Sequence, residues 1–116
     1  MTGILSDVKK TLSVDPDVTD FDLEIIMHIN GVLGTLNQLG IGPSEGLEIS
    51  DDTVTWDSLI GTEVRLNAVK TYVYLRVRRL FDPPTTSYLV DAYAKQIEEL
   101  EWRLTVAVDE IAAASV

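Results

Sequence analysis

The sequence contains no cysteine among its 116 residues. Without a thiol the chain cannot form a disulfide, cannot offer thiolate ligands to a metal ion and cannot use a cysteine nucleophile. Disulfides are rare in cytosolic proteins, so the absence of cysteine is compatible with a cytosolic protein. We therefore expect a protein that is made, or assembled, in a cytosol.

Histidine is almost as scarce, because His28 is the only one. A single histidine rules out metal sites built from several imidazoles, and its place inside a predicted helix favours a packing or surface role over catalysis. The acidic stretch 15–26 lacks the spacing of a calcium loop, and no glycine-rich segment has the spacing of a phosphate loop. We expect no catalytic residue, no metal ligand and no cofactor, and hence no enzyme.

Long apolar runs are also missing. No segment reaches the roughly 18 apolar residues that a membrane-spanning helix requires. The first ten residues, MTGILSDVKK, lack the basic region and apolar region of a signal peptide. The sequence therefore predicts no membrane contact.

Basic residues are few and unevenly placed. Nine lysines and arginines face 19 aspartates and glutamates, which gives a net charge of −10. This charge disfavours binding to nucleic acid phosphates, which lysine and arginine must neutralise. Three arginines, Arg76, Arg78 and Arg79, cluster on one predicted helix. We expect them to pair with carboxylates of this chain or of an acidic neighbouring subunit, and nucleic acid contact is the alternative.

Apolar periodicity predicts a single all-α domain over residues 1–116, a small bundle of about four helices. The breaks between the helices fall at Pro16, at Gly40 and at the pair Pro83-Pro84. Gly31 and Gly34 lie inside the second helix and weaken it, so we expect them to permit the close approach of another backbone. The predicted helices cover about residues 4–12, 20–39, 62–81 and from 86 or 87 to at least 112.

The loop 41–61 between the second and third helices has no helical period. Two short extended pieces, Leu47–Ile49 and Val54–Trp56, flank a possible turn at Asp51-Asp52, which predicts a possible short β-hairpin. A single helical turn capped by Thr55 follows in the stretch WDSLI. Loops of this length are often either functional or disordered, and Trp56 favours partial order. The candidate contact residues in this loop are Glu48, Asp51, Asp52 and Trp56.

The last helix carries the strongest pattern in the chain. Its apolar residues are separated alternately by three and four positions, which is the heptad spacing of a helix–helix seam. A helix of about 26 residues is roughly 39 Å long, whereas a compact chain of this size is roughly 35 Å across. We therefore expect the segment 104–116 to reach the edge of the domain, where another polypeptide covers it. The alternative is that the seam packs wholly within the four-helix domain, which the pattern favours more for residues 90–100 than for residues 107–116. The seam consists of Val90, Tyr93, Ile97, Leu100, Leu104, Ala107 and Ile111.

The stretch VRLNAVKTYVYLRVRRLFDPPTTSYLVDAYAKQIEELEWRLTVAVD resembles the head–tail connector (adaptor) family of long-tailed phages. The most specific part is LFDPP…AYAKQIEELEWRL, and the piece TWDSLIG and the short helical N-terminus also fit. The resemblance implies a small structural protein of the virion neck, assembled in the host cytoplasm. It implies a homo-oligomeric ring, commonly of twelve copies, beneath the portal protein. Such a ring extends the DNA channel and contacts the next neck or tail-terminator protein, and double-stranded DNA passes through it without specific binding.

Carried onto this sequence, the resemblance assigns roles to three sets of residues. The portal-docking candidates are Arg103, Leu104, Ala107, Val108, Ile111 and Val116. The subunit-interface candidates are Val90, Tyr93, Ile97 and Leu100, together with Arg76, Arg78 and Arg79. The loop residues named above are candidates for contact with a neighbour. Two other functions stay open at this point: a small dimeric helical regulator that uses the heptad seam, and an acidic DNA mimic that binds a basic protein.

Overall fold

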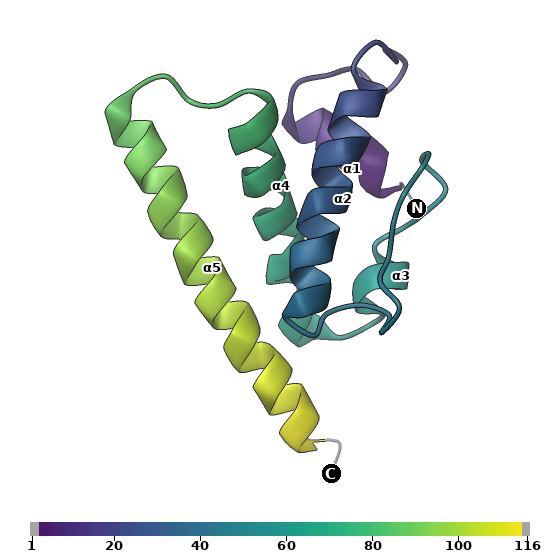
Figure 1. Ribbon diagram of the computed structural model, residues 1–116, viewed down its shortest axis with the longest axis vertical. Coiled ribbons are helices and arrows are strands. Elements are labelled where there is room, and N and C mark those ends of the chain that lie inside the picture. Colours follow the sequence, from purple (N-terminus) through teal and green to yellow (C-terminus); the bar gives the residue numbers. More distant parts are fainter. Residues whose placement is uncertain (1–2, 115–116) are drawn as a thin grey trace.

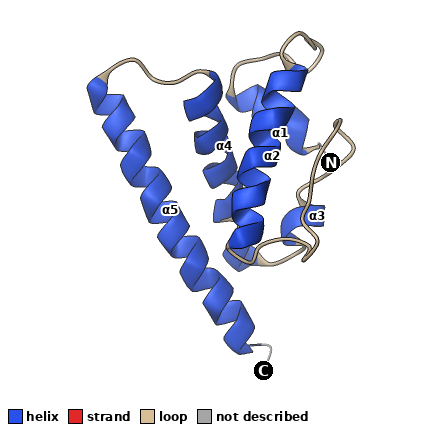
Figure 2. Ribbon diagram, viewed as in Figure 1, coloured by secondary structure: helices blue, strands red, loops and turns tan. Residues whose placement is uncertain are grey.

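The computed structural model describes residues 3–114, and every regular element in that range is helical (Figure 1, Figure 2). The prediction of an all-α bundle with a long C-terminal helix is confirmed. No helix within residues 3–114 is both long enough and apolar enough to cross a bilayer. The elements are α1 (Ile4–Thr11), α2 (Asp22–Gln38), α3 (Asp57–Ile60), the 3₁₀ turn η1 (Val64–Leu66), α4 (Ala68–Phe81) and α5 (Ser87–Ala114).

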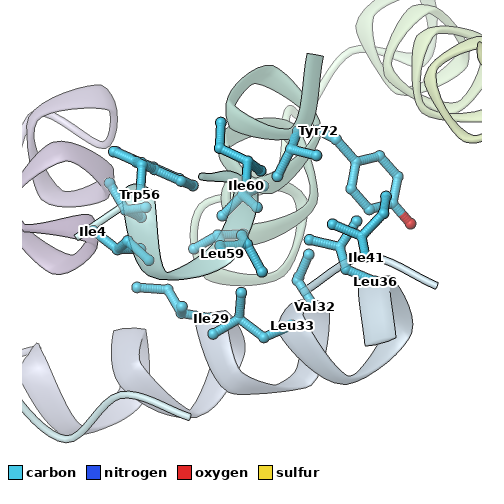
Figure 3. Close-up of a cluster of buried hydrophobic side chains, with 14 of the residues drawn as sticks. Ile4, Ile29, Val32, Leu33, Leu36, Ile41, Trp56, Leu59, Ile60 and Tyr72 are labelled. Atoms are coloured by element: carbon cyan, nitrogen blue, oxygen red, sulfur yellow. The ribbon is translucent and has the colours of Figure 1, made fainter. Parts of the chain in front are cut away.

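The core forms where α1, α2, α3 and α4 meet (Figure 3). α4 contacts α1, α2 and α5, so it is the central helix of the bundle. Its side chains Val69, Tyr72, Val73 and Val77 are fully buried. α2 packs against α4 through the stripe Ile25, Ile29, Val32, Leu33 and Leu36.

The first helix is held by a residue of the distant loop. The carboxylate of Asp52 accepts a hydrogen bond of 2.8 Å from the Ser6 backbone N–H and a second one from the Ser6 hydroxyl. It thereby satisfies an N–H group in the first turn of α1, which no carbonyl of the helix can reach. Gly3 lies so close to Asp52 that a Cβ added at Gly3 would fall 2.2 Å from the Asp52 carbonyl oxygen.

The possible β-hairpin is wrong, because the described part of the chain contains no strand. The backbone of the loop bonds to a side chain of α2 instead of to a second strand. The side-chain amide of Asn30 donates a hydrogen bond of 3.0 Å to the Ile49 carbonyl oxygen and accepts one of 2.8 Å from the Ile49 N–H. The short helix after the loop is confirmed as α3, but its cap is Trp56, and Thr55 contributes its carbonyl oxygen rather than its side chain.

The third long helix also begins later than predicted. The side chain of Glu63 accepts a hydrogen bond from the Arg65 backbone N–H and caps the separate 3₁₀ turn η1. Glu63 also forms an ion pair of 2.9 Å with the Arg65 guanidinium. The α-helical geometry of α4 starts only at Ala68, so residues 62–67 form a connection to the helix.

α5 contains 28 residues and spans about 42 Å. The described molecule measures 46 × 35 × 21 Å, so this helix runs along nearly its whole length. α4 and α5 diverge toward the loop that joins them, which leaves the start of α5 apart from the bundle (Figure 1). α4 has only 14 residues, about 21 Å, and can therefore cover about half of α5.

Candidate interaction surfaces

Within residues 3–114 no three His, Cys, Asp or Glu side chains are placed to hold a metal ion. His28 is half-buried, and its Nε2 lies 3.7 Å from an oxygen of Glu24 in the preceding turn of α2. The notable features of the surface are apolar side chains on the outer sides of helices.

The middle of the α5 seam is covered by the chain itself. Ile97, Leu100, Leu104 and Ala107 are buried, and Leu104 is only 1% exposed. The expectation that another polypeptide must cover Leu104 and Ala107 is therefore wrong. The bundle reaches further along α5 than the size estimate allowed, because η1 also packs against this helix.

Two other portal-docking candidates near the end of α5 are partly covered. Val108 and Ile111 pack against the core and are half-buried, and a Cβ added at Gly40 would lie 3.3 Å from Val108. Arg103 is exposed. Val116 lies outside the described residues. The docking role of this segment stays a prediction.

The uncovered part of the seam lies at the start of α5. Val90 is a heptad position and is 45% exposed, and Tyr93 is half-buried, although both continue the line of Ile97 and Leu100. Leu80, at the end of α4, is also exposed. These residues lie on both sides of the turn between α4 and α5, which we call the elbow. The exposed apolar side chains of the elbow are Leu80, Tyr88, Leu89 and Val90.

A partly buried polar chain joins α4 to α5 beside the covered part of the seam. Arg76 Nη1 donates a hydrogen bond of 2.7 Å to the Tyr72 hydroxyl, which donates one of 2.6 Å to Glu101 Oε2. The Arg76 guanidinium also lies over the Tyr72 ring, 5.5 Å from its centre. Burial raises the pKa of the Tyr72 phenol, and its hydrogen bond to Glu101 raises the pKa further. Arg76 therefore acts inside the chain, through Tyr72, on a carboxylate of its own subunit.

The other two arginines of the cluster face solvent. Arg78 and Arg79 are exposed beside Leu80, and neither takes part in an ion pair among residues 3–114. The next residue, Phe81, packs edge-on against Phe21 at the start of α2, with ring centres 5.6 Å apart. The basic end of α4 therefore lies next to the start of α2 at one end of the molecule.

Trp56, a predicted loop contact, is buried inside the chain. Its indole Nε1 donates a hydrogen bond of 2.8 Å to Asp7 Oδ2, and its ring meets the edge of Tyr74 with centres 5.8 Å apart. The ammonium group of Lys70 lies 5.9 Å from the centre of the indole. In this arrangement Trp56 fastens the loop to α1 and α4.

The acidic loop candidates divide into two groups. Asp52 binds Ser6 as described, and Asp51 accepts hydrogen bonds from the Thr53 hydroxyl and N–H, at 2.6 and 3.0 Å. These two bonds, the side-chain bond above all, lower the pKa of Asp51. Glu48 is exposed. Asp51 and Asp52 are exposed too, so Glu48 differs from them in that its side chain forms no hydrogen bond or ion pair within residues 3–114.

The outer face of α2 is unusual for a solvent-facing helix side. We call this surface the α2 face. Leu23 is 75% exposed and Met27 is 66% exposed, and the glycines Gly31 and Gly34 continue the same line. A Cβ added at either glycine would meet nothing within 4 Å, so the close approach expected for them is not made inside this chain. Sequence reasoning missed Leu23 and Met27, although their spacing opposite the buried stripe was visible. The α2 face consists of Leu23, Met27, Gly31, Gly34 and Gln38.

A groove of about 240 Å³ lies beside the second half of α5. Trp102 is 68% exposed at its rim, and the side chains of Arg65 and Arg103 also line it. Exposed tryptophan and arginine are the residue types that dominate the energetic centres of protein interfaces. Sequence reasoning did not single out Trp102, which lies off the heptad seam.

Comparison with known proteins gives one match. A family model described as phage connector protein covers residues 4–111 of the chain. These residues include α1 through most of α5, and with them all the surfaces described above. No curated protein and no solved structure matches the chain.

Proposed function

Because the chain belongs to the phage connector protein family, we propose that it is a structural protein of the phage neck that joins the capsid to the tail. Membership implies assembly with other virion proteins, a place in the virion and a structural rather than an enzymatic role. The observation that carries the proposal is the match itself, which covers nearly the whole chain. Long-tailed phages are the proposed source.

A homo-oligomeric ring beneath the portal protein is the proposed assembly, with twelve copies as the expected number. A closed ring requires two different patches on each subunit, one of which meets the other on the next copy. The α2 face and the elbow are two separate apolar surfaces of this kind. Exposed apolar surface of this extent is typical of a protein that binds a partner.

The portal contact is proposed at the C-terminal half of α5. Arg103 and the groove beside Trp102 are accessible there, and Val108 and Ile111 are partly accessible. Leu104 and Ala107 support this contact from inside the subunit, because their side chains are buried. The opposite end of the ring would receive the next neck protein or the tail terminator.

The charge of the chain suits a channel for DNA. Residues 11–63 carry eleven aspartates and glutamates and no lysine or arginine. A wall of this sign repels phosphates, whereas a basic wall would bind them with release of counterions. We propose that double-stranded DNA passes through the ring without specific binding.

The dimeric regulator is less well supported, because Ile97, Leu100 and Leu104 are covered by the chain's own bundle. A coiled-coil dimer needs several consecutive heptad positions free, and here only the start of the seam is free. No contact or surface in the described residues favours the DNA mimic over the connector.

The experiment is deletion of the gene from a phage that encodes this protein, followed by electron microscopy of the lysate. The proposal predicts capsids and tails that are not joined, and joined particles when the protein is supplied from a plasmid. Antibody labelling of intact particles should mark the neck. Infectious tailed particles in the absence of the protein would refute the proposed function.

A further inference from the structure

We propose that the α2 face of one copy packs against the elbow of the next copy, so that these two surfaces form the subunit contact of the ring. The inference rests on the proposed ring and names the surfaces that build it. The partner of the α2 face is thus a second copy of this chain, in head-to-tail order.

The α2 face has the composition of a buried helix side. A helix side that stays in solvent is normally polar or charged. Here the only charged residue of α2 on the side opposite the buried stripe is Glu24, at the edge of that side, and the two large side chains Leu23 and Met27 are mostly exposed. Another polypeptide that covers this face would remove apolar surface from water.

The two glycines indicate how closely that polypeptide approaches. Gly31 and Gly34 weaken α2, and inside this chain neither is required by a positive φ angle or by a crowded neighbour. With no Cβ on this side, a second helix can approach the backbone of α2 more closely than over larger side chains. The open space next to both glycines therefore fits a helical partner.

The elbow offers such a helix. Val90 and Tyr93 hold heptad positions, and the same seam is covered by the bundle from Ile97 onward. α4 ends at Phe81 and cannot follow α5 to its start. The first turns of α5 thus present a helix–helix seam that lacks a partner within residues 3–114.

Charge selects between the possible pairings. Asp20 and Glu24 are exposed next to Leu23, and the arginines Arg78 and Arg79 are exposed next to Leu80. The elbow also exposes Asp82, Asp91 and Lys95, so its net charge is +1, which is still opposite in sign to that of Asp20 and Glu24. Two α2 faces packed on one another would bring acidic residues together in a chain that already has a net charge of −10. Head-to-tail packing is therefore favoured over a symmetric dimer.

Cysteine cross-linking tests the contact directly, because the natural chain has no cysteine. The variants are Met27→Cys, Val90→Cys and the double variant, each oxidised at a concentration at which native mass spectrometry shows oligomers. We expect no cross-linked dimer from either single variant, a dimer from their equimolar mixture, and a ladder of higher multimers from the double variant. The control mixture pairs Met27→Cys with Glu48→Cys, whose thiol lies in the exposed loop.

Four results would overturn the inference. Efficient dimerisation of Met27→Cys alone would show that two α2 faces pair symmetrically. A control mixture that cross-links as well as the test mixture would show random collision. Rings that form without any Met27–Val90 cross-link would reject these surfaces while the proposed function stands. A chain that forms no oligomer, even with portal protein added, would instead count against the ring itself and would reject the inference with it.

Discussion

The hydroxyl of Tyr72 on α4 donates a hydrogen bond of 2.6 Å to the carboxylate of Glu101 on α5. The Tyr72 side chain is completely buried, and Arg76 donates to the same hydroxyl from the next turn of α4. This polar chain lies within the covered part of the α5 seam, because Glu101 stands between the buried residues Leu100 and Leu104. It therefore helps to hold α5 against α4.

Substitution of Tyr72 by phenylalanine should destabilise the fold by about 1–2 kcal/mol, because Arg76 and Glu101 both lose a buried partner. The free energy of unfolding is measured by urea denaturation followed by circular dichroism. Tyr74→Phe is the matched control, since the described structure shows no hydrogen bond from the Tyr74 hydroxyl. An equal effect of both substitutions would mean that the Tyr72–Glu101 bond contributes nothing specific.

The same tyrosine predicts a loss of stability in alkaline solution. Its pKa is raised in the folded state, by burial first and by Glu101 second, so the folded chain holds this proton more tightly than the unfolded chain. The resulting stabilisation is complete below the ordinary value of about 10 and disappears as the pH rises through the higher folded value. Urea denaturation between about pH 9 and 11 should show a steeper decline for the natural chain than for Tyr72→Phe. Parallel declines would contradict the assignment to Tyr72.

Lys9 is a buried cation that ties α1 to the start of α2. Its ammonium group lies 2.6 Å from Asp22 Oδ1 and donates to the carbonyl oxygens of Pro16 and Val18, while the side chain is only 2% exposed. Lys9→Met keeps the length of the side chain but leaves these acceptors without their donor, so we expect a loss of about 3 kcal/mol. Thermal or urea denaturation measures it. The neighbouring Lys10 is exposed, and Lys10→Met should change stability by no more than about 0.5 kcal/mol.

Alanine at Gly31 or Gly34 should have opposite effects on the fold and on assembly. Each substitution should stabilise the isolated chain by about 0.5–1 kcal/mol, because the added methyl group meets no atom and helix propensity improves. The same methyl groups should weaken ring formation, measured by native mass spectrometry, if a second helix lies over them. Unchanged assembly by the double variant would argue against close packing on the α2 face.

Gly40→Ala should have the opposite effect on the stability of the isolated chain from alanine at Gly31 or Gly34. Gly40 has a φ angle of +92°, which an alanine adopts only with strain, and its Cβ would lie 3.3 Å from Val108. This substitution should therefore destabilise the fold. The sign of the change in the free energy of unfolding thus distinguishes a glycine that the fold requires from one that it leaves open.

The helices could be predicted because their patterns are local. Ile25, Ile29 and Leu36 repeat at helical spacing, and the stop at Gly40 is a single-residue property. The loop could not be predicted in the same way. Asn30 and Ile49 are 19 residues apart. No local pattern predicts that the Asn30 side chain, rather than a second strand, bonds to the backbone of Ile49. The burial of Lys9 was missed for a related reason, since lysine is seldom buried and its three acceptors converge only in the folded chain.

The sequence predicted an apolar seam on the last helix but not which part of that seam is exposed. The heptad spacing from Val90 to Ile111 showed that the last helix has a continuous seam, but which part stays uncovered depends on where α4 ends relative to α5. That relation is tertiary, and it leaves Val90 exposed and Leu104 buried. The role of Arg76 could not be predicted for the same reason. Its partner Tyr72 is one turn away on the same helix, but the final acceptor Glu101 lies on another helix.

An electron cryomicroscopy reconstruction of the neck of the intact phage tests the central claim most directly. The account predicts a ring of this chain between portal and tail, in which Leu23 and Met27 of each copy are buried against Leu80 and Val90 of the next. A neck that lacks this chain would contradict the proposed function. A ring in which Leu23 and Met27 still face solvent would contradict the claim that the α2 face is a subunit contact.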